Sequence, residues 1–323
     1  MNKRRGDDET RRHGEVKKRR RDGETRRHGD KNSILRVAAS PRLGVLSSAA
    51  SPRLRVVSSA PLITLLTDFG TADYFVAAVK GVILSANPKA RIVDITHDVP
   101  AHDIESAAFT LLAAHSSFPP GAIHLAVVDP GVGSERRPLL VKVNEQFFVG
   151  PDNGVFSYVS DRGTPEAFHL TAEKYWRQPV STTFHGRDIF APAAAALSLG
   201  AKPGDLGTKT SEFLRLAPLR PVIADGKLEA RIIHIDRFGN CVTSLRQDDL
   251  NGQTIAAGAS LRVNGKSIRS IRKYFSEQTG SKEKLFAIWG SAGFLEIAAT
   301  NQSAAKLLKA QRGDAVFLSV QPL

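Results

Sequence analysis

Sulfur-containing residues are nearly absent from the sequence. Its 323 residues include one cysteine, Cys241, and one methionine, Met1. A single cysteine cannot form an internal disulfide, and the chain has no C-x-x-C, zinc-ligand or haem-attachment spacing. These absences exclude a disulfide-stapled scaffold and fit a reducing compartment, so we predict a cytoplasmic protein.

Long apolar runs and phosphate-binding motifs are missing as well. No stretch of about 18 apolar residues occurs, and we therefore predict no membrane span. Neither G-x-x-x-x-G-K-[ST] nor a G-x-G-x-x-G after a strand is present, which argues against a phosphate-cradling loop. With 41% hydrophobic residues the chain can still bury a core, and its length allows two domains.

The net charge of +13 is unevenly distributed along the chain. Residues 1–60 hold 17 Lys/Arg and 7 Asp/Glu, whereas residues 61–323 hold 28 and 25. The second part is therefore nearly neutral, and a basic tail is not a basic binding face. We expect no specific nucleic-acid partner.

Residues 1–60 are polar and repetitive. The segment E-T-R-R-H-G at residues 9–14 recurs at 24–29, and A-S-P-R-L at 39–43 recurs at 50–54. Such a composition buries too little apolar surface to order itself. A targeting segment and a mis-assigned start are alternatives, but we predict a disordered basic tail without a catalytic role.

From residue 61 onward, strand and helix patterns alternate. This alternation predicts an α/β domain over residues 61–217, with a mostly parallel sheet and helices on both faces. The predicted strands are residues 62–67, 91–96 and 122–128 with a hairpin at 139–149, and the predicted helices are residues 73–86, 104–114 and 189–199.

A second composition begins after the segment L-A-P-L-R-P at residues 216–221, which we interpret as a linker. Short apolar runs separated by Gly, Asn and Asp predict a smaller all-β barrel or sandwich over residues 222–323. Its predicted strands are residues 228–235, 241–245, 260–263, 284–288, 294–298 and 315–320.

The segment V-V-D-P-G-V-G-S-E-R-R-P at residues 127–138 carries the strongest chemical signal. An apolar strand ends at Asp129, and a glycine-containing loop follows that presents Arg136 and Arg137. Carboxylates at the carboxyl end of a strand in an open α/β sheet lie where ligands usually bind. An ordinary turn with an exposed ion pair is the alternative.

Five other segments bear on this interpretation. They are L-I-T-L-L-T-D-F-G-T-A-D-Y at residues 62–74, F-V-G-P-D-N-G-V-F-S-Y at 148–158, T-F-H-G-R-D-I-F-A-P at 183–192, I-D-R-F-G-N-C-V at 235–242 and W-G-S-A-G-F-L-E-I-A-A-T-N at 289–301. Together with residues 127–138 they resemble the S-adenosylmethionine (SAM) hydroxide adenosyltransferase family. The members of that family are related to the halogenases that make 5′-halo-5′-deoxyadenosine.

The resemblance implies that an activated water attacks the 5′ carbon of SAM and releases adenosine and methionine. It also implies that Asp129, Arg136 and His185 position and activate this water. Bulk water has a pKa of about 15.7, so the nucleophile is the difficult part of the reaction. A carboxylate or a neutral imidazole can accept its proton, and the sequence leaves the identity of the base open.

The resemblance also assigns residues that bind the substrate. A carboxylate at Asp68 suits the two hydroxyls of the ribose, whereas Asp73 has helix capping as its simpler role. The remaining candidates are Asp236, Phe238 and Asn240, with the ring on adenine and the amide at its edge, and Ser291, Glu296 and Thr300. Each of these six has an ordinary turn role as its alternative.

In the family the pocket lies between the first domain of one subunit and the second domain of its neighbour. The resemblance therefore implies a homotrimer with shared sites, and SAM as the substrate with no cofactor and no metal.

Two departures separate the sequence from the halogenases. Their long insertion is absent, because only residues 139–150 separate the glycine loop from P-D-N-G. They also lack the acid, arginine and histidine set, and they carry a tryptophan where this chain has His102. Both departures favour hydroxide over halide, although halide transfer remains an alternative.

Three further alternatives stay open. A metal-dependent hydrolase would use the cluster Asp94, His97, Asp98, His102 and Asp103, which lacks an H-E-x-x-H spacing. A nucleic-acid-associated protein would depend on the basic tail. A non-catalytic adenosine or SAM sensor would have no use for an activated water.

Overall fold

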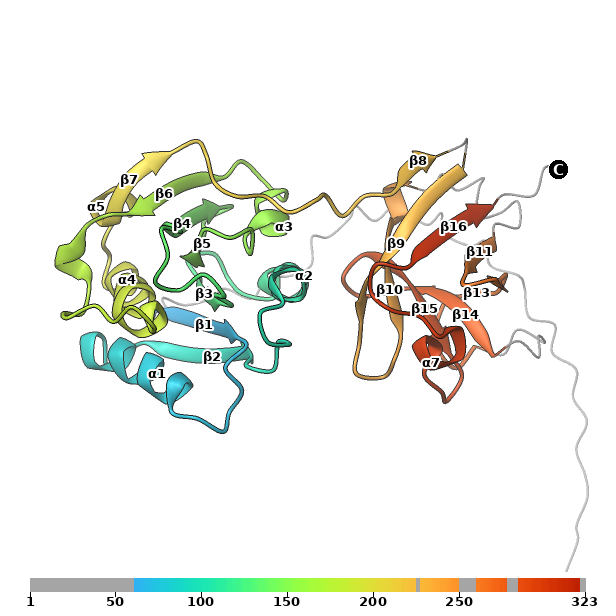
Figure 1. Ribbon diagram of the computed structural model, residues 1–323, viewed down its shortest axis with the longest axis horizontal. Coiled ribbons are helices and arrows are strands. Elements are labelled where there is room, and N and C mark those ends of the chain that lie inside the picture. The colour runs from blue at the N-terminus through green and yellow to red at the C-terminus, as the bar shows by residue number, and fades with distance from the viewer. Residues whose placement is uncertain (1–60, 225–226, 250–259, 278–283, 320–323) are drawn as a thin grey trace, which may run out of the picture. The chain divides into compact units, whose positions relative to one another are not determined.

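The computed structural model describes residues 61–224, 227–249, 260–277 and 284–319 (Figure 1). Our predictions for residues 1–60 lie outside the described residues. Within the described residues, no helix combines the length and the apolar character that a membrane span requires.

The first domain is built on a seven-stranded sheet with the order β2-β1-β3-β5-β4-β6-β7. Strands β2, β1, β3, β5 and β6 run in one direction, and β4 and β7 run in the other. The bounds are β1 Leu62–Thr67, β2 Arg91–Thr96, β3 Ile123–Val127, β4 Pro138–Val143, β5 Gln146–Pro151, β6 Glu166–Leu170 and β7 Gly207–Thr210.

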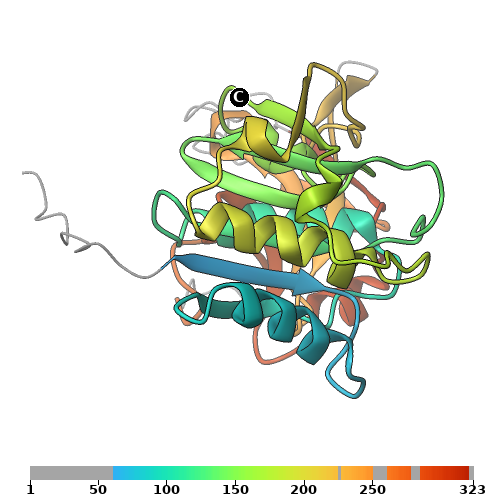
Figure 2. The ribbon, with the colours of Figure 1, turned by 90° about the vertical axis from the view of Figure 1, so that its left-hand side faces the viewer.

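Helices cover both faces of this sheet, as the alternation of strand and helix patterns predicts. Ile63 and Leu65 of β1 belong to the core under α1 (Phe75–Ala86) and α4 (Ala191–Ser198), which pack against each other (Figures 1 and 2). Leu66 belongs to the core under α2 (Ile104–His115) and α3 (Ser157–Ser160). A short helix, α5 (Pro203–Leu206), precedes β7.

Among the described residues, the second domain forms a curled nine-stranded sheet around the long strand β9. One stretch of β9 pairs with β8 and β16, and its other end pairs with β10. The bounds are β8 Val222–Ala224, β9 Lys227–Ile235, β10 Cys241–Arg246, β11 Ser260–Val263, β12 Lys266–Ile268, β13 Ile271–Arg272, β14 Leu285–Trp289, β15 Phe294–Ala299 and β16 Ala315–Ser319, with helix α7 at Ala304–Leu308. The predicted fold class is confirmed.

Two details of the predicted helices are wrong. Helix α1 begins at Phe75 with Tyr74 as its N-cap and no side-chain cap, so Asp73 lies too far upstream to cap it. The first two residues of the helix predicted at 189–199 belong to a π-helical turn, Gly186–Phe190, and α4 runs from Ala191 to Ser198. Strands β6 and β7 and the short helices α3 and α5 were not predicted.

Gly150 of β5 lies directly against the backbone of β3. A Cβ at this position would lie 2.2 Å from the carbonyl oxygen of Ala126. Gly150→Ala should therefore destabilise the fold by about 2 kcal/mol or more, because the strands must separate. Gly81→Ala is the control, since Gly81 lies in α1 with open space around it and should gain about 0.5–1 kcal/mol. Urea unfolding measures both, and equal effects would contradict this account of the strand contact.

Candidate functional site

The loop after β3 folds back on itself and returns Arg136 to Asp129. The backbone N–H of Val132 donates to the carbonyl of Asp129 at 3.2 Å. The hydroxyl of Ser134 donates to the Gly131 carbonyl at 2.6 Å and accepts from the Arg136 N–H at 3.2 Å. The side chains seven residues apart therefore meet, as the motif predicts.

Gly133 brings this loop against the segment that carries His185. Its φ of +78° favours glycine, and a Cβ would lie 2.3 Å from the carbonyl oxygen of Thr182. His185 follows three residues later as the N-cap of the π-helical turn. The contact between Gly133 and Thr182 thus joins two segments that are far apart in the sequence.

The three predicted catalytic side chains form one connected group. Arg136 donates from Nε to Oδ1 of Asp129 at 2.9 Å and from Nη2 to Oδ2. The same Nη2 lies 2.7 Å from Nδ1 of His185. The side chains of Arg136 and Asp129 are only 9% and 6% exposed, so this pair is largely shielded from water.

The surroundings favour a neutral imidazole at His185. Burial lowers its pKa, and the cation of Arg136 lowers it further, whereas the carboxylates of Asp129 and Asp188 act in the opposite direction. Arg187 is bound to Asp188 at 2.7 and 2.8 Å rather than to His185. His185 is therefore available to the cavity beside it.

A cavity of about 310 Å³ opens beside this group. Asp129 and His185 line it together with Asp68, which accepts a hydrogen bond from the backbone N–H of His102 at 2.9 Å. Three aromatic rings that the sequence analysis did not single out form an apolar wall, with ring centres 5.2 to 6.0 Å apart: Phe69, Phe75 and Phe184. Phe69 directly follows Asp68, and Phe184 directly precedes His185. Their positions next to two candidate site residues could have indicated in the sequence that these rings line the cavity.

The candidates of the second domain divide between two places. Asp236 and Asn240 close the β9–β10 turn, where both Asp236 oxygens accept from Asn240, at 2.8 Å from its backbone and 2.9 Å from its amide. Phe238 at the tip is 79% exposed and lines a cavity of about 560 Å³ with Asn240 and Phe275, a residue that the sequence analysis missed. The Asn240 amide nitrogen is thus engaged within the turn.

The remaining candidates line neither of these two cavities. Ser291 is exposed between β14 and β15, and Thr300 accepts from Arg272 at 3.3 Å. Burial raises the pKa of Glu296, and the negative charge of Asp236 raises it further. Two neighbouring carboxylates of this kind suit a cationic group such as an ammonium. Asp73 is exposed in the turn before α1.

Two family models together match most of the chain. The model of the SAM hydroxide adenosyltransferase N-terminal domain matches residues 63–207, and the model of the C-terminal domain matches residues 230–317. The chain belongs to the SAM hydroxide adenosyltransferase family. The resemblance inferred from the motifs is confirmed.

The alignments with relatives extend over most of the length of this family member. The (R)-S-adenosyl-L-methionine hydrolase of Salinispora tropica is 38% identical over 264 residues, which is 79% of this chain and 96% of the relative. That of Methanocaldococcus jannaschii is 34% identical over 76% of this chain and 91% of its own. A fluorinase of an Actinoplanes species is 26% identical over 63% of this chain and 78% of its own. A crystal structure of an uncharacterized conserved protein from Thermotoga maritima superposes with a TM-score of 0.73 at 34% identity, covering 79% and 99% of the two chains.

The members of the Asp/His cluster considered for metal binding are engaged in ion pairs and hydrogen bonds in this SAM hydroxide adenosyltransferase. Asp94 pairs with Lys80 at 2.7 Å and lies 3.2 Å from Nε2 of His97, whose Nδ1 bonds to Thr67 at 2.8 Å. Asp103 caps α2 by accepting from the Ser106 N–H at 3.0 Å. Across the described ranges, no three His, Cys, Asp or Glu residues gather as metal ligands would.

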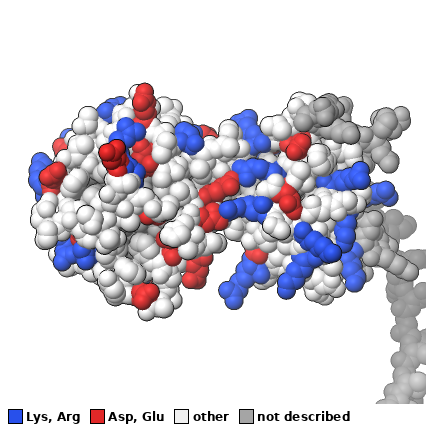
Figure 3. Space-filling model, in the orientation of Figure 1, with Lys and Arg blue, Asp and Glu red and all other residues white. Residues whose placement is uncertain are grey.

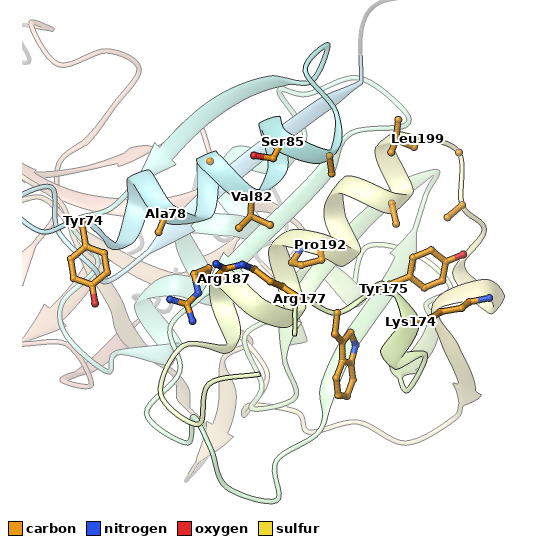
Figure 4. Close-up of a pocket in the computed structure, with 16 residues that line it drawn as sticks. Tyr74, Ala78, Val82, Ser85, Lys174, Tyr175, Arg177, Arg187, Pro192 and Leu199 are labelled. Atoms are coloured by element: carbon orange, nitrogen blue, oxygen red, sulfur yellow. The ribbon is translucent and has the colours of Figure 1, made fainter. Parts of the chain in front are cut away.

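A larger groove of about 1080 Å³ runs between α1 and α4 (Figure 4). Lys174, Arg177 and Arg187 line it, and both arginines pair with the buried Asp188. No carboxylate or histidine lines the groove, so it offers no acceptor for a proton from water. The catalytic candidates belong to the smaller cavity.

Lys and Arg side chains gather over the second domain on the face shown in Figure 3, whereas both signs are scattered over the first. This distribution of charge does not test nucleic-acid binding. The absence of a specific nucleic-acid partner stays a prediction.

Arg136→Met should raise the pKa of His185, because the buried cation that helps to lower this pKa is lost. NMR titration of the His185 ring measures this change. Arg137→Met is the matched control, since Arg137 pairs with Asp152 at 3.1 Å and makes no recorded contact with His185. An unchanged titration in Arg136→Met would contradict the assigned electrostatic coupling.

Proposed function

We propose that the protein hydrolyses SAM to adenosine and methionine. The observation that carries the proposal is the joining of Asp129, Arg136 and His185 beside a cavity that also contains Asp68. The names of the relatives that match most of the chain support the same reaction. Those names specify the R configuration at sulfur, so the R epimer of the sulfonium is included in the proposed substrate.

The reaction needs an activated water and little else. The water oxygen forms a bond to C5′ while the C5′–S bond breaks, and the electron pair of that bond goes to sulfur. Methionine leaves as a neutral thioether, so no acid is needed at the leaving group. The proton of the water passes to a side chain of the cavity and then to solvent, and we propose that neither a metal nor another cofactor takes part.

The apolar wall of the cavity supports this chemistry. Phe69, Phe75 and Phe184 line the cavity that also contains Asp68 and Asp129, and we propose that these rings limit the access of bulk water. Asp68 accepts a hydrogen bond from the His102 N–H, and its remaining lone pairs can accept hydrogen bonds from the ribose hydroxyls. A carboxylate at Asp129 also disfavours a halide ion at the same position, because the two anions repel each other.

We also propose a trimer in which the first domain of one subunit meets the second domain of its neighbour. The cavity at Phe238 and Phe275 offers exposed rings for adenine, and Glu296 with Asp236 offers negative charge for the methionine ammonium. A cytoplasmic location stays a prediction.

Incubation of the purified protein with each epimer of SAM, with and without chloride, should give adenosine and methionine in equal amounts by liquid chromatography. Asp129→Asn should lower the rate by about 10²-fold or more, because the carboxylate that receives the proton is lost. Asp161→Asn makes the same chemical change at an exposed surface ion pair and should keep the activity.

A chlorinated nucleoside in the chloride arm would assign the protein to halide transfer. No product from either epimer would contradict the proposed hydrolysis, and equal rates in the two variants would contradict the role of the Asp129 carboxylate.

A further inference from the structure

Two of the three side chains Asp129, Arg136 and His185 line the cavity, and the third lies behind them. Asp129 and His185 line the cavity, whereas Arg136 does not. The Arg136 guanidinium carbon lies 5.2 Å from the ring centre of the fully buried Phe190. Its Nη1 is buried and has no recorded hydrogen-bond partner. The guanidinium therefore lies behind the two residues that face the substrate.

We infer that Arg136 is a positioning residue, that Asp129 is the base, and that His185 is a hydrogen-bond donor to the attacking water. This division of roles rests on the proposed hydrolysis of SAM.

Counting protons fixes the tautomer of His185. A guanidinium carries only donors, and the two hydrogens of Arg136 Nη2 point to Oδ2 of Asp129 and to Nδ1 of His185. Nδ1 must therefore accept, and in a neutral ring the proton then resides on Nε2. The lowered pKa of His185 keeps the ring in this neutral form near neutral pH.

This tautomer limits what His185 can do in the cavity. With Nδ1 occupied by Arg136 and Nε2 protonated, the ring has no free lone pair for a proton from water. It can donate its Nε2 hydrogen to the oxygen of the attacking water and thereby orient it.

Asp129 retains the capacity that His185 lacks. Each carboxylate oxygen has two lone-pair sites, and Arg136 occupies one on each oxygen. The remaining sites can receive the proton as the C–O bond forms. A weak base suffices, because the water becomes strongly acidic once its oxygen is bonded to carbon.

Amide substitutions at position 185 separate a donor from a base, since amides cannot act as general bases. The amide of His185→Gln reaches the position of Nε2 and can donate there, whereas that of His185→Asn reaches only the position of Nδ1. We expect kcat of His185→Gln to stay within about 10-fold of the native value, and kcat of His185→Asn and His185→Ala to fall by about 10²-fold or more. A His185→Gln variant as inactive as His185→Ala would overturn the donor role.

Nitrogen NMR of the His185 ring tests the tautomer without any turnover. The native protein should show an unprotonated Nδ1 and a protonated Nε2 at neutral pH. Arg136→Lys keeps a positive charge but loses the guanidinium that donates to Asp129 and His185 together. The His185 ring should then populate both tautomers, and kcat should fall by a larger factor than KM changes. A protonated Nδ1 in the native protein, or an unchanged ring in Arg136→Lys, would overturn the role of Arg136.

The two proposals fail separately. If the native protein forms no adenosine, the proposed function fails while the tautomer is still measured. If adenosine forms but the native ring carries its proton on Nδ1, the division of roles fails and the hydrolase assignment stands.

Discussion

A single guanidinium holds the candidate site together. Arg136 donates to both oxygens of Asp129 and to the ring of His185, in a place where neither Arg136 nor Asp129 is more than 9% exposed. An unpaired carboxylate at such a depth would cost several kcal/mol or would bind a proton. The cation of Arg136 thus gives the Asp129 carboxylate a partner and lowers the pKa of His185, and the proposed hydrolysis uses both of these groups in one cavity.

The backbone that supports this guanidinium depends on contacts with different sequence separations. Asp129 and Arg136 belong to one loop, so the V-V-D-P-G-V-G-S-E-R-R motif was enough to predict that they meet. His185 belongs to a distant segment, which meets this loop where Gly133 touches the Thr182 carbonyl. No periodicity in the sequence encodes that contact, and the motif resemblance supplied what local patterns could not.

The same distinction explains where the sequence analysis succeeded and failed elsewhere. The bounds of β1 and β2 follow directly from apolar runs and were predicted to the residue. The predicted role of Asp73 as a helix cap was wrong, because the N-cap of α1 is Tyr74 and the helix begins at Phe75. A shift of one residue in the start of a helix is enough to remove a side-chain cap. Arg136 and Arg137 are indistinguishable in the sequence, yet one pairs with Asp129 and the other with Asp152. Side-chain direction in a loop is set by tertiary packing, which the sequence pattern does not show.

The family relationship to fluorinases can be understood from the charge of the cavity. A halide nucleophile arrives as an anion, so a site for it must offer donors and exclude carboxylates. A water nucleophile arrives neutral and must lose a proton, so its site must offer an acceptor. Asp129, facing the cavity with lone pairs to spare and held by a cation from behind, meets the second requirement and violates the first. In the proposed division of roles, the negative charge of this one side chain just after β3 therefore favours water over halide as the nucleophile for the same sulfonium substrate.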